Sequence, residues 1–257
     1  MSCDPFEDVW QPFFTLFRRY WDNCPYPKYF CTDAKPVQEA GFVPITPGKG
    51  LAWSYRLKHA VSQIKTPYVL FLQDDFFIEK PVLNTDIEEV LNIQRQENAG
   101  LMRIFPTPGP DRPYKAYPQV GLIAQNADYR ISCQAAIWER DTLLALIDDT
   151  ENIWQFELEG TKRAQKLQKT FLSVHTHYHN GYYPVPYFCT AVLKGKWMRS
   201  VLPLLEKEQL NIDLKKRGVQ SRYEAWRDRV FAHSPKPVQG YVWLMLYKWP
   251  KKVLGVG

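Results

Sequence analysis

Tyr68-Val69-Leu70-Phe71-Leu72-Gln73-Asp74-Asp75-Phe76-Phe77 is an unbroken run of apolar residues that ends in two adjacent carboxylates. Such a run is typical of a strand that is buried on both faces of a mostly parallel sheet. Open α/β sheets bind their ligands at the carboxyl ends of the strands. Two acids there repel each other, and a divalent cation that prefers oxygen ligands, Mg²⁺ or Mn²⁺, would relieve the repulsion. The alternative is a strand-to-loop transition with two solvated acids.

The segments around this strand alternate between the two hydrophobic periodicities. Strands are expected over 28–32, 42–46, 101–105 and 129–138, and helices over 4–20, 51–64, 85–96, 140–147 and 154–169. Alternation of this kind favours βαβ units, and hence an α/β fold with a mostly parallel central sheet flanked by helices. Residues 106–118 hold five prolines and are expected to form a long functional loop. We expect one domain over 1–257, with a helical and aromatic elaboration at its C-terminal end.

The first helix starts unusually early for a doubly wound sheet. Asp4-Pro5-Phe6-Glu7 has an acid cap, proline in the first turn and Glu three residues after the cap. Only Met1 and Ser2 precede Cys3. Either the opening strand is very short, or the given start lies too far downstream.

Composition restricts the function class. The net charge of +6 and the pI of about 8.9 suit phosphate-bearing ligands or an anionic membrane surface, but the charge is too mild and too evenly spread for nucleic acid. The five cysteines are odd in number and show no CxxC spacing, which favours a reduced cytoplasmic setting. No secretory pattern opens the chain. P-loop, GxGxxG, GxSxG and HExxH motifs are also absent from the sequence.

Two residues on the helix before the acid-tipped strand are candidates for nucleotide binding. Arg56 has a planar fork that suits a diphosphate, or it lies on a solvated helix face. Trp53 packs against a base or, as we favour, against the core.

A second acidic segment, Trp154-Gln155-Phe156-Glu157-Leu158-Glu159, places carboxylates among large apolar residues. Burial would raise the pKa of Glu157, as a general base requires. On a helix Glu157 and Glu159 point about 200° apart, so they cannot serve one site. A surface helix is the alternative.

Basic and metal-ligating side chains occur later in the chain. In a strand, the histidines of His175-Thr176-His177-Tyr178-His179 would share one face, and His177 is a candidate metal ligand. The alternative is a set of satisfied polar side chains. Lys196, in Lys194-Gly195-Lys196-Trp197, is a candidate phosphate contact, whereas 215–217 is expected to be a solvated charge run.

Several motifs in one order resemble bacterial glycosyltransferase-like proteins of the nucleotide-sugar-dependent GT-A type. They are found at residues 8–21 (DxWxPFFxLxxxYW), 53–61 (WSxRLxxAL), 68–77 (YVLxLxDDFF), 132–138 (SxQAAIW), 154–157 (WxFE) and 194–197 (KGKW). Together they cover most of residues 4–200.

The resemblance implies a single Rossmann-like GT-A domain, with a nucleotide-binding half over about 1–105 and an acceptor-side half over about 106–257. Asp74 and Asp75 would hold a divalent metal, Mn²⁺ or Mg²⁺, against the donor diphosphate, and Asp74 would help to place the ribose. Arg56 would lie near the nucleotide. Glu157 would be the general base of an inverting transfer to a glycan or glycolipid hydroxyl, as in polysaccharide biosynthesis. The motif reads Gln73-Asp74-Asp75 rather than Asp-x-Asp.

Two rival functions remain open on the sequence. A metal-dependent nucleotidyl- or phosphotransferase would use the same acids with a nucleoside triphosphate. A non-catalytic relative would bind nucleotide or carbohydrate without turnover. Localisation is expected to be cytoplasmic. Residues 241–252 place aromatics beside lysines, as an interfacial anchor at the inner face of the membrane would, although a core strand is the favoured alternative.

Overall fold

The structure of the chain, a computed structural model, describes residues 1–115, 117–188 and 190–233. The chain divides into two units, Met1–Cys189 and Thr190–Gly257, and each is treated by itself. Residues 241–252, the expected membrane anchor, lie outside the described residues. Among the residues described, no helix is long and apolar enough to cross a membrane.

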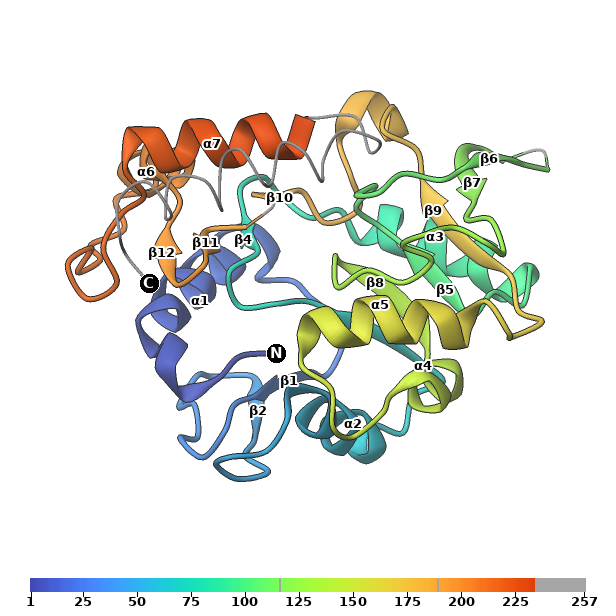
Figure 1. The fold of residues 1–257 in the computed structure, drawn as a ribbon, viewed down its shortest axis with the longest axis horizontal. Coiled ribbons are helices and arrows are strands. Elements are labelled where there is room, and N and C mark those ends of the chain that lie inside the picture. Colours follow the sequence, from blue (N-terminus) through green and yellow to red (C-terminus); the bar gives the residue numbers. More distant parts are fainter. Residues whose placement is uncertain (116, 189, 234–257) are drawn as a thin grey trace, which may run out of the picture. The chain divides into compact units, whose positions relative to one another are not determined.

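A six-stranded sheet organises the first unit (Figure 1). Its strands, in spatial order, are β3 (Tyr68–Phe71), β8 (Ala136–Glu139), β5 (Leu101–Arg103), β9 (Phe171–Val174), β7 (Tyr117–Leu122) and β6 (Arg112–Tyr114). The sheet is mixed: β3, β5 and β9 run in the same direction, and β8 lies between β3 and β5 antiparallel to both. Strands from both of the expected halves, 1–105 and 106–257, belong to this one sheet.

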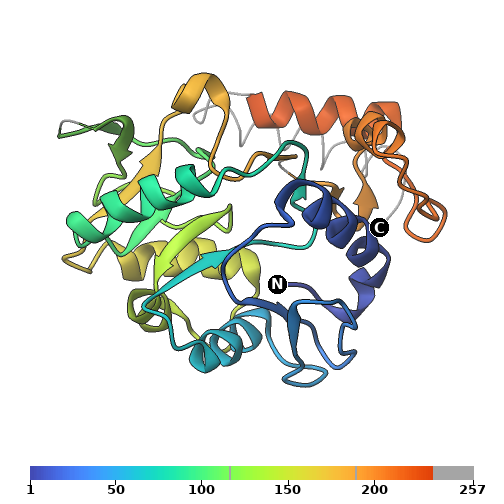
Figure 2. The ribbon, with the colours of Figure 1, turned by 180° about the vertical axis from the view of Figure 1, so that it is seen from behind.

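Helices cover both faces of the sheet, which confirms the α/β class. The helices of the first unit are α1 (Glu7–Trp21, preceded by the 3₁₀ turn η1, Asp4–Phe6), α2 (Trp53–Gln63), α3 (Asn84–Gln96), α4 (Arg140–Leu146) and α5 (Ile153–Ala164). Helix α5 crosses one face in Figure 1, and α3 crosses the opposite face when the molecule is viewed from behind in Figure 2. The main core lies beneath α2, α4 and α5. Its buried members include Leu57, Phe71, Leu101, Trp138, Phe156 and Phe171.

Short strand pairs complete the first unit. They are the parallel pair β1 (Lys28–Cys31) and β2 (Phe42–Ile45), and the antiparallel pair β4 (Phe77–Ile78) and β10 (Tyr187–Phe188). Aromatic side chains of α1 pack against β1 and β2. The ring of Phe14 is tilted against that of Phe30, with 4.8 Å between their centroids, and meets the ring of Phe42 edge to face at 5.0 Å. Aromatic burial is therefore mainly a packing feature of this region.

The second unit is small. It contains the hairpin of β11 (Val192–Leu193) and β12 (Lys196–Trp197), the 3₁₀ turn η3 (Arg199–Val201), α6 (Leu202–Lys207) and α7 (Arg222–His233). Trp197 is fully buried, and the guanidinium of Arg217 lies over its ring at 5.6 Å.

Three expected elements differ from the structure. Only the last part of 129–138 is strand, since β8 begins at Ala136. The proline-rich segment 106–118 contains β6 and the start of β7. The histidine segment is not a strand: β9 ends at Val174, and His179 has a left-handed backbone (φ 37°) within the 3₁₀ turn η2 (Tyr178–Gly181). The prediction that the three histidines share one face of a strand is therefore wrong.

Candidate functional site

The acid pair follows β3, and it is buried. Asp74 and Asp75 expose only 4% and 7% of their surface. The hydroxyl of Ser2 donates to Asp74 Oδ2 at 2.5 Å, and the backbone N–H of Asp74 donates to the carbonyl of Met1 at 3.2 Å. The N-terminal residues thus hold Asp74 in place, and the solvated alternative does not describe this pair.

Burial and the neighbouring charge of Asp75 make ionisation of Asp74 unfavourable when no cation is bound. Desolvation, followed by the charge of Asp75, raises the pKa of Asp74 to about 7 from an ordinary 3.8. Two buried carboxylates that destabilise each other's charge are a donor set that fits a hard divalent cation. A cation bound there would favour the ionised form of both groups.

Arg56 is buried, and the N-terminal residue Ser2 connects it to Asp74 by hydrogen bonds. Its Nη1 atom is 2.7 Å from Asp33 Oδ1 and donates to the carbonyl of Ser2 at 2.6 Å. Its buried Nε has no hydrogen-bond partner. The guanidinium therefore sits where the carboxyl end of β1 meets the N-terminal segment, and it is held there by Asp33 and the backbone of Ser2.

Asp4 fixes the loop that carries Asp33. Its Oδ1 accepts the backbone N–H groups of Asp33, Ala34 and Lys35, each at 3.1 Å. Asp33 Oδ2 in turn accepts the backbone N–H of Asp4 at 3.0 Å. These reciprocal bonds join the start of the first helix to the carboxyl end of β1.

Glu157 is oriented by the start of α5. Asn152 caps this helix: its Oδ1 accepts the N–H of Gln155 at 2.9 Å, and Gln155 Oε1 accepts the N–H of Asn152 at 2.9 Å. Glu157 then points toward the loop before β8, where its Oε1 accepts the backbone N–H of Cys133 at 2.6 Å. Glu159 instead faces solvent and pairs with Lys162 at 2.7 Å. The two acids serve different sides of the helix, as expected.

The environment of Glu157 suits an acid–base role. Burial raises the pKa of Glu157, and the Cys133 N–H and the charge of Arg103 oppose that rise only in part. Arg103 is itself buried, and desolvation lowers its pKa to about 10. A half-buried carboxyl with a raised pKa is the tuning that general bases need near neutral pH.

One backbone segment connects Glu157 to the acid pair. Cys133 donates its N–H to Glu157, and its carbonyl accepts from Gln73 Nε2 at 3.2 Å. Gln73 immediately precedes Asp74. The next peptide, at Ala135, donates its N–H to the hydroxyl of Tyr187 at 3.1 Å. Side chains therefore hold the loop before β8 in place, and hydrogen bonds of this loop link Glu157 to the residue that precedes Asp74.

Trp53 and Lys196 lie in different settings. The ring of Trp53 packs against Phe71 at 6.2 Å and Phe156 at 5.6 Å, within the main core. Lys196 belongs to the second unit, where its Nζ is 2.7 Å from Glu224 Oε1. Trp53 therefore packs in the core, and Lys196 forms an ion pair within the second unit.

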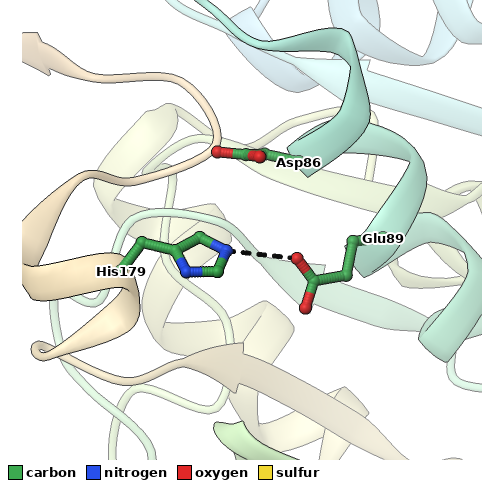
Figure 3. Close-up of side chains that lie close together, drawn as sticks. All are labelled: Asp86, Glu89 and His179. Atoms are coloured by element: carbon green, nitrogen blue, oxygen red, sulfur yellow. Dashed lines mark hydrogen bonds and ion pairs between the residues drawn. The ribbon is translucent and has the colours of Figure 1, made fainter.

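The histidines separate into two groups. His175 and His177 stack at 4.9 Å, and His177 Nε2 lies 3.3 Å from the carbonyl of Pro118. His179 instead meets α3, where it groups with Asp86 and Glu89 (Figure 3). These three residues are of metal-ligating types, with one ligand atom from each within 4.8 Å of the others.

The hydrogen bonds of His179 decide how this group is arranged. Gln119 Oε1 accepts the backbone N–H of His179 at 3.0 Å, so the amide nitrogen of Gln119 is the atom that faces Nδ1, at 3.0 Å. Nδ1 is then an acceptor, and the neutral ring carries its proton on Nε2, which lies 3.2 Å from Glu89 Oε2. A metal ion would need that nitrogen unprotonated. The group as it stands is a hydrogen-bonded pair beside Asp86.

Sequence reasoning missed Ser2, Asp33 and the backbone of Cys133. Asp33 follows a short strand and could have been noticed as a further acid at a carboxyl strand end. Ser2 and Cys133 carry no local signal, because their roles depend on contacts between distant segments. Asp86 and Glu89 are three residues apart on a helix, which places them on one face.

Comparison with known proteins finds similarity among solved structures only. A scan against models of protein families and a search of curated proteins found no match. Among solved structures, the chain is similar to residues 1–349 of TarS from S. aureus, with a TM-score of 0.48 and 12% sequence identity, over 100% of this chain and 75% of that chain. A similarity at this level does not define a function, so the function proposed below rests on the site itself.

Proposed function

We propose that this protein is a glycosyltransferase that moves a sugar from a nucleotide-sugar donor to a hydroxyl of a glycan or glycolipid. The observation that carries the proposal is the buried pair Asp74 and Asp75, joined through Gln73 and the backbone of Cys133 to Glu157. One end of this arrangement suits a metal-bound diphosphate, and the other suits proton removal from an acceptor.

The roles of the residues follow from their chemistry. Asp74 and Asp75 would hold a divalent cation, which supplies charge stabilisation to the departing diphosphate. Arg56, held by Asp33 at the carboxyl end of β1, would contact the nucleotide side of the donor. Glu157 would take the proton of the attacking hydroxyl, and its raised pKa suits that step. Attack from the side opposite the leaving group would make the transfer inverting.

The test is a thermal-shift screen of nucleotide sugars with Mn²⁺. A ligand present at 100 times its Kd adds about 2.7 kcal/mol of stability, which raises the Tm by roughly 5–10 °C for a chain of this size. The expected result is a shift that needs both the nucleotide sugar and Mn²⁺. Product analysis then separates the function from its rivals: release of nucleoside diphosphate supports glycosyl transfer, whereas pyrophosphate release from a nucleoside triphosphate contradicts it.

A further inference from the structure

An apolar cavity of about 330 Å³ separates β1 from β3 in the first unit. Strand β3 pairs with β8 on one side only, and β1 pairs with β2 on one side only. The facing edges of β1 and β3 have no strand between them among the described residues. Val69 and Leu70, apolar residues of β3, are left half-exposed as a result. An open strand edge that lies against apolar surface is a template for another strand.

The carboxyl end of this gap already contains backbone in strand-like register. The nitrogen of Met1 donates to the carbonyl of Leu72 at 2.9 Å, and Asp74 donates to the carbonyl of Met1. On the other side, the N–H of Ser2 donates to the carbonyl of Cys31 at 2.8 Å. Met1 and Ser2 thus bridge both sides, with the pattern of a parallel strand toward β3. At this end the gap is one strand wide.

Both faces of the gap are apolar. On one face α1 and α3 contribute Phe13, Trp21 and Leu91, and on the other α2 contributes Leu57 and Val61. Successive side chains of a strand point to opposite faces. A strand in the gap would therefore need apolar residues at every position, as strands buried on both faces do.

We propose that the gap is a strand slot, filled by an extended apolar segment of about four residues that is joined to the amino side of Met1. The register follows from the bonds of Met1 and Ser2. The residue immediately before Met1 would donate its N–H to the carbonyl of Tyr29, and the second residue before Met1 would donate to Leu70. Such a segment, about 13 Å long, would join β2, β1, β3 and β8 into one continuous sheet. It would lead directly into Ser2, whose hydroxyl holds Asp74.

The test compares chains that carry five added residues before Met1. One extension is Lys-Val-Ile-Val-Val, and its matched control is Gly-Ser-Gly-Ser-Gly. The apolar extension is expected to raise the Tm by about 5 °C or more over the control, because it buries side chains on both faces of the slot. It is also expected to slow hydrogen exchange of the amides in Lys28–Cys31 and Tyr68–Phe71. Replacing the second residue before Met1 by proline removes the N–H directed at Leu70 and should cancel most of the gain.

Two results would overturn the proposal. Equal Tm values and exchange rates for the apolar and Gly/Ser extensions would show that the slot does not take a strand. A free peptide of the same apolar sequence that stabilises the unextended chain, when the joined extension does not, would assign the slot to a separate partner.

Discussion

Replacement of Asp74 by asparagine should make the protein more stable at high pH. The carboxyl of Asp74 is buried next to Asp75, and its pKa is raised to about 7. Near pH 4 and below, this group is protonated whether the chain is folded or unfolded. Between about pH 4 and pH 7 the folded state keeps the proton and the unfolded state loses it, so the stability of the wild type falls as the pH rises. Asparagine never ionises and still offers an oxygen to Ser2.

The size of the effect follows from the two pKa values. The difference between 3.8 and about 7 corresponds to about 4 kcal/mol of unfolding free energy at full ionisation. With a chelator present, Asp74→Asn should match the wild type near pH 4. By pH 8 it should exceed the wild type by an amount on the order of 4 kcal/mol.

Urea unfolding at pH 4.5 and pH 8 in the presence of EDTA measures this difference. Asp149→Asn is the control, since Asp149 is exposed and pairs with Lys58 at the surface. That variant should follow the pH dependence of the wild type. Added Mn²⁺ at pH 8 should stabilise the wild type and not Asp74→Asn. The same pH dependence in Asp74→Asn and the wild type would refute the reasoning that Asp74 is a strained buried acid.

Three further predictions concern the rest of the site and chain. Glu157→Gln should keep donor binding but lower the rate of sugar transfer about 10²–10⁴-fold in a turnover assay. The control Glu159→Gln should transfer at a near-normal rate. A loss of rate in Glu159→Gln alone would show that Glu159, not Glu157, is the general base. Tyr187→Phe removes the hydroxyl that is hydrogen-bonded to the loop before β8, and it should lower the free energy of unfolding in denaturant by about 1–2 kcal/mol. The control Tyr183→Phe loses an exposed hydrogen bond and should lower it by under about 0.5 kcal/mol. Equal losses of stability in the two variants would argue against a role for the loop contact. If residues 241–252 anchor the protein, anionic vesicles should co-sediment it at low salt and release it at high salt; no binding at low salt would leave the core strand.

The parts of the fold that follow local rules were predictable from the sequence. The apolar run 68–72 predicts a strand, and β3 lies there. The expected burial on both faces is met only at Phe71, because β3 is an edge strand and its first three residues are half-exposed. The cap at Asn152 and the period of the helix fix the opposite orientations of Glu157 and Glu159. These features depend on residues within one or two turns of each other.

The remaining features depend on contacts between distant segments. The antiparallel position of β8 between β3 and β5 is a choice of partner that no local periodicity encodes. The ion pair of Arg56 with Asp33 joins a helix to the end of a strand, so the guanidinium is buried rather than on a solvated face. The turn at His179 depends on left-handed backbone, which histidine adopts only occasionally. Its interaction with Glu89 was therefore not foreseen.

The most direct measurement is a calorimetric titration of Mn²⁺ and a nucleoside diphosphate into the wild type and Asp75→Asn. Asp75 lies at the end of the acid pair, next to the aromatic residues that lead into β4. The account predicts that the nucleoside diphosphate binds the wild type only with Mn²⁺, and that Asp75→Asn loses this binding while its circular dichroism spectrum stays the same. Unchanged affinity in Asp75→Asn, or binding to the wild type that does not depend on Mn²⁺, would contradict the metal-bound donor site.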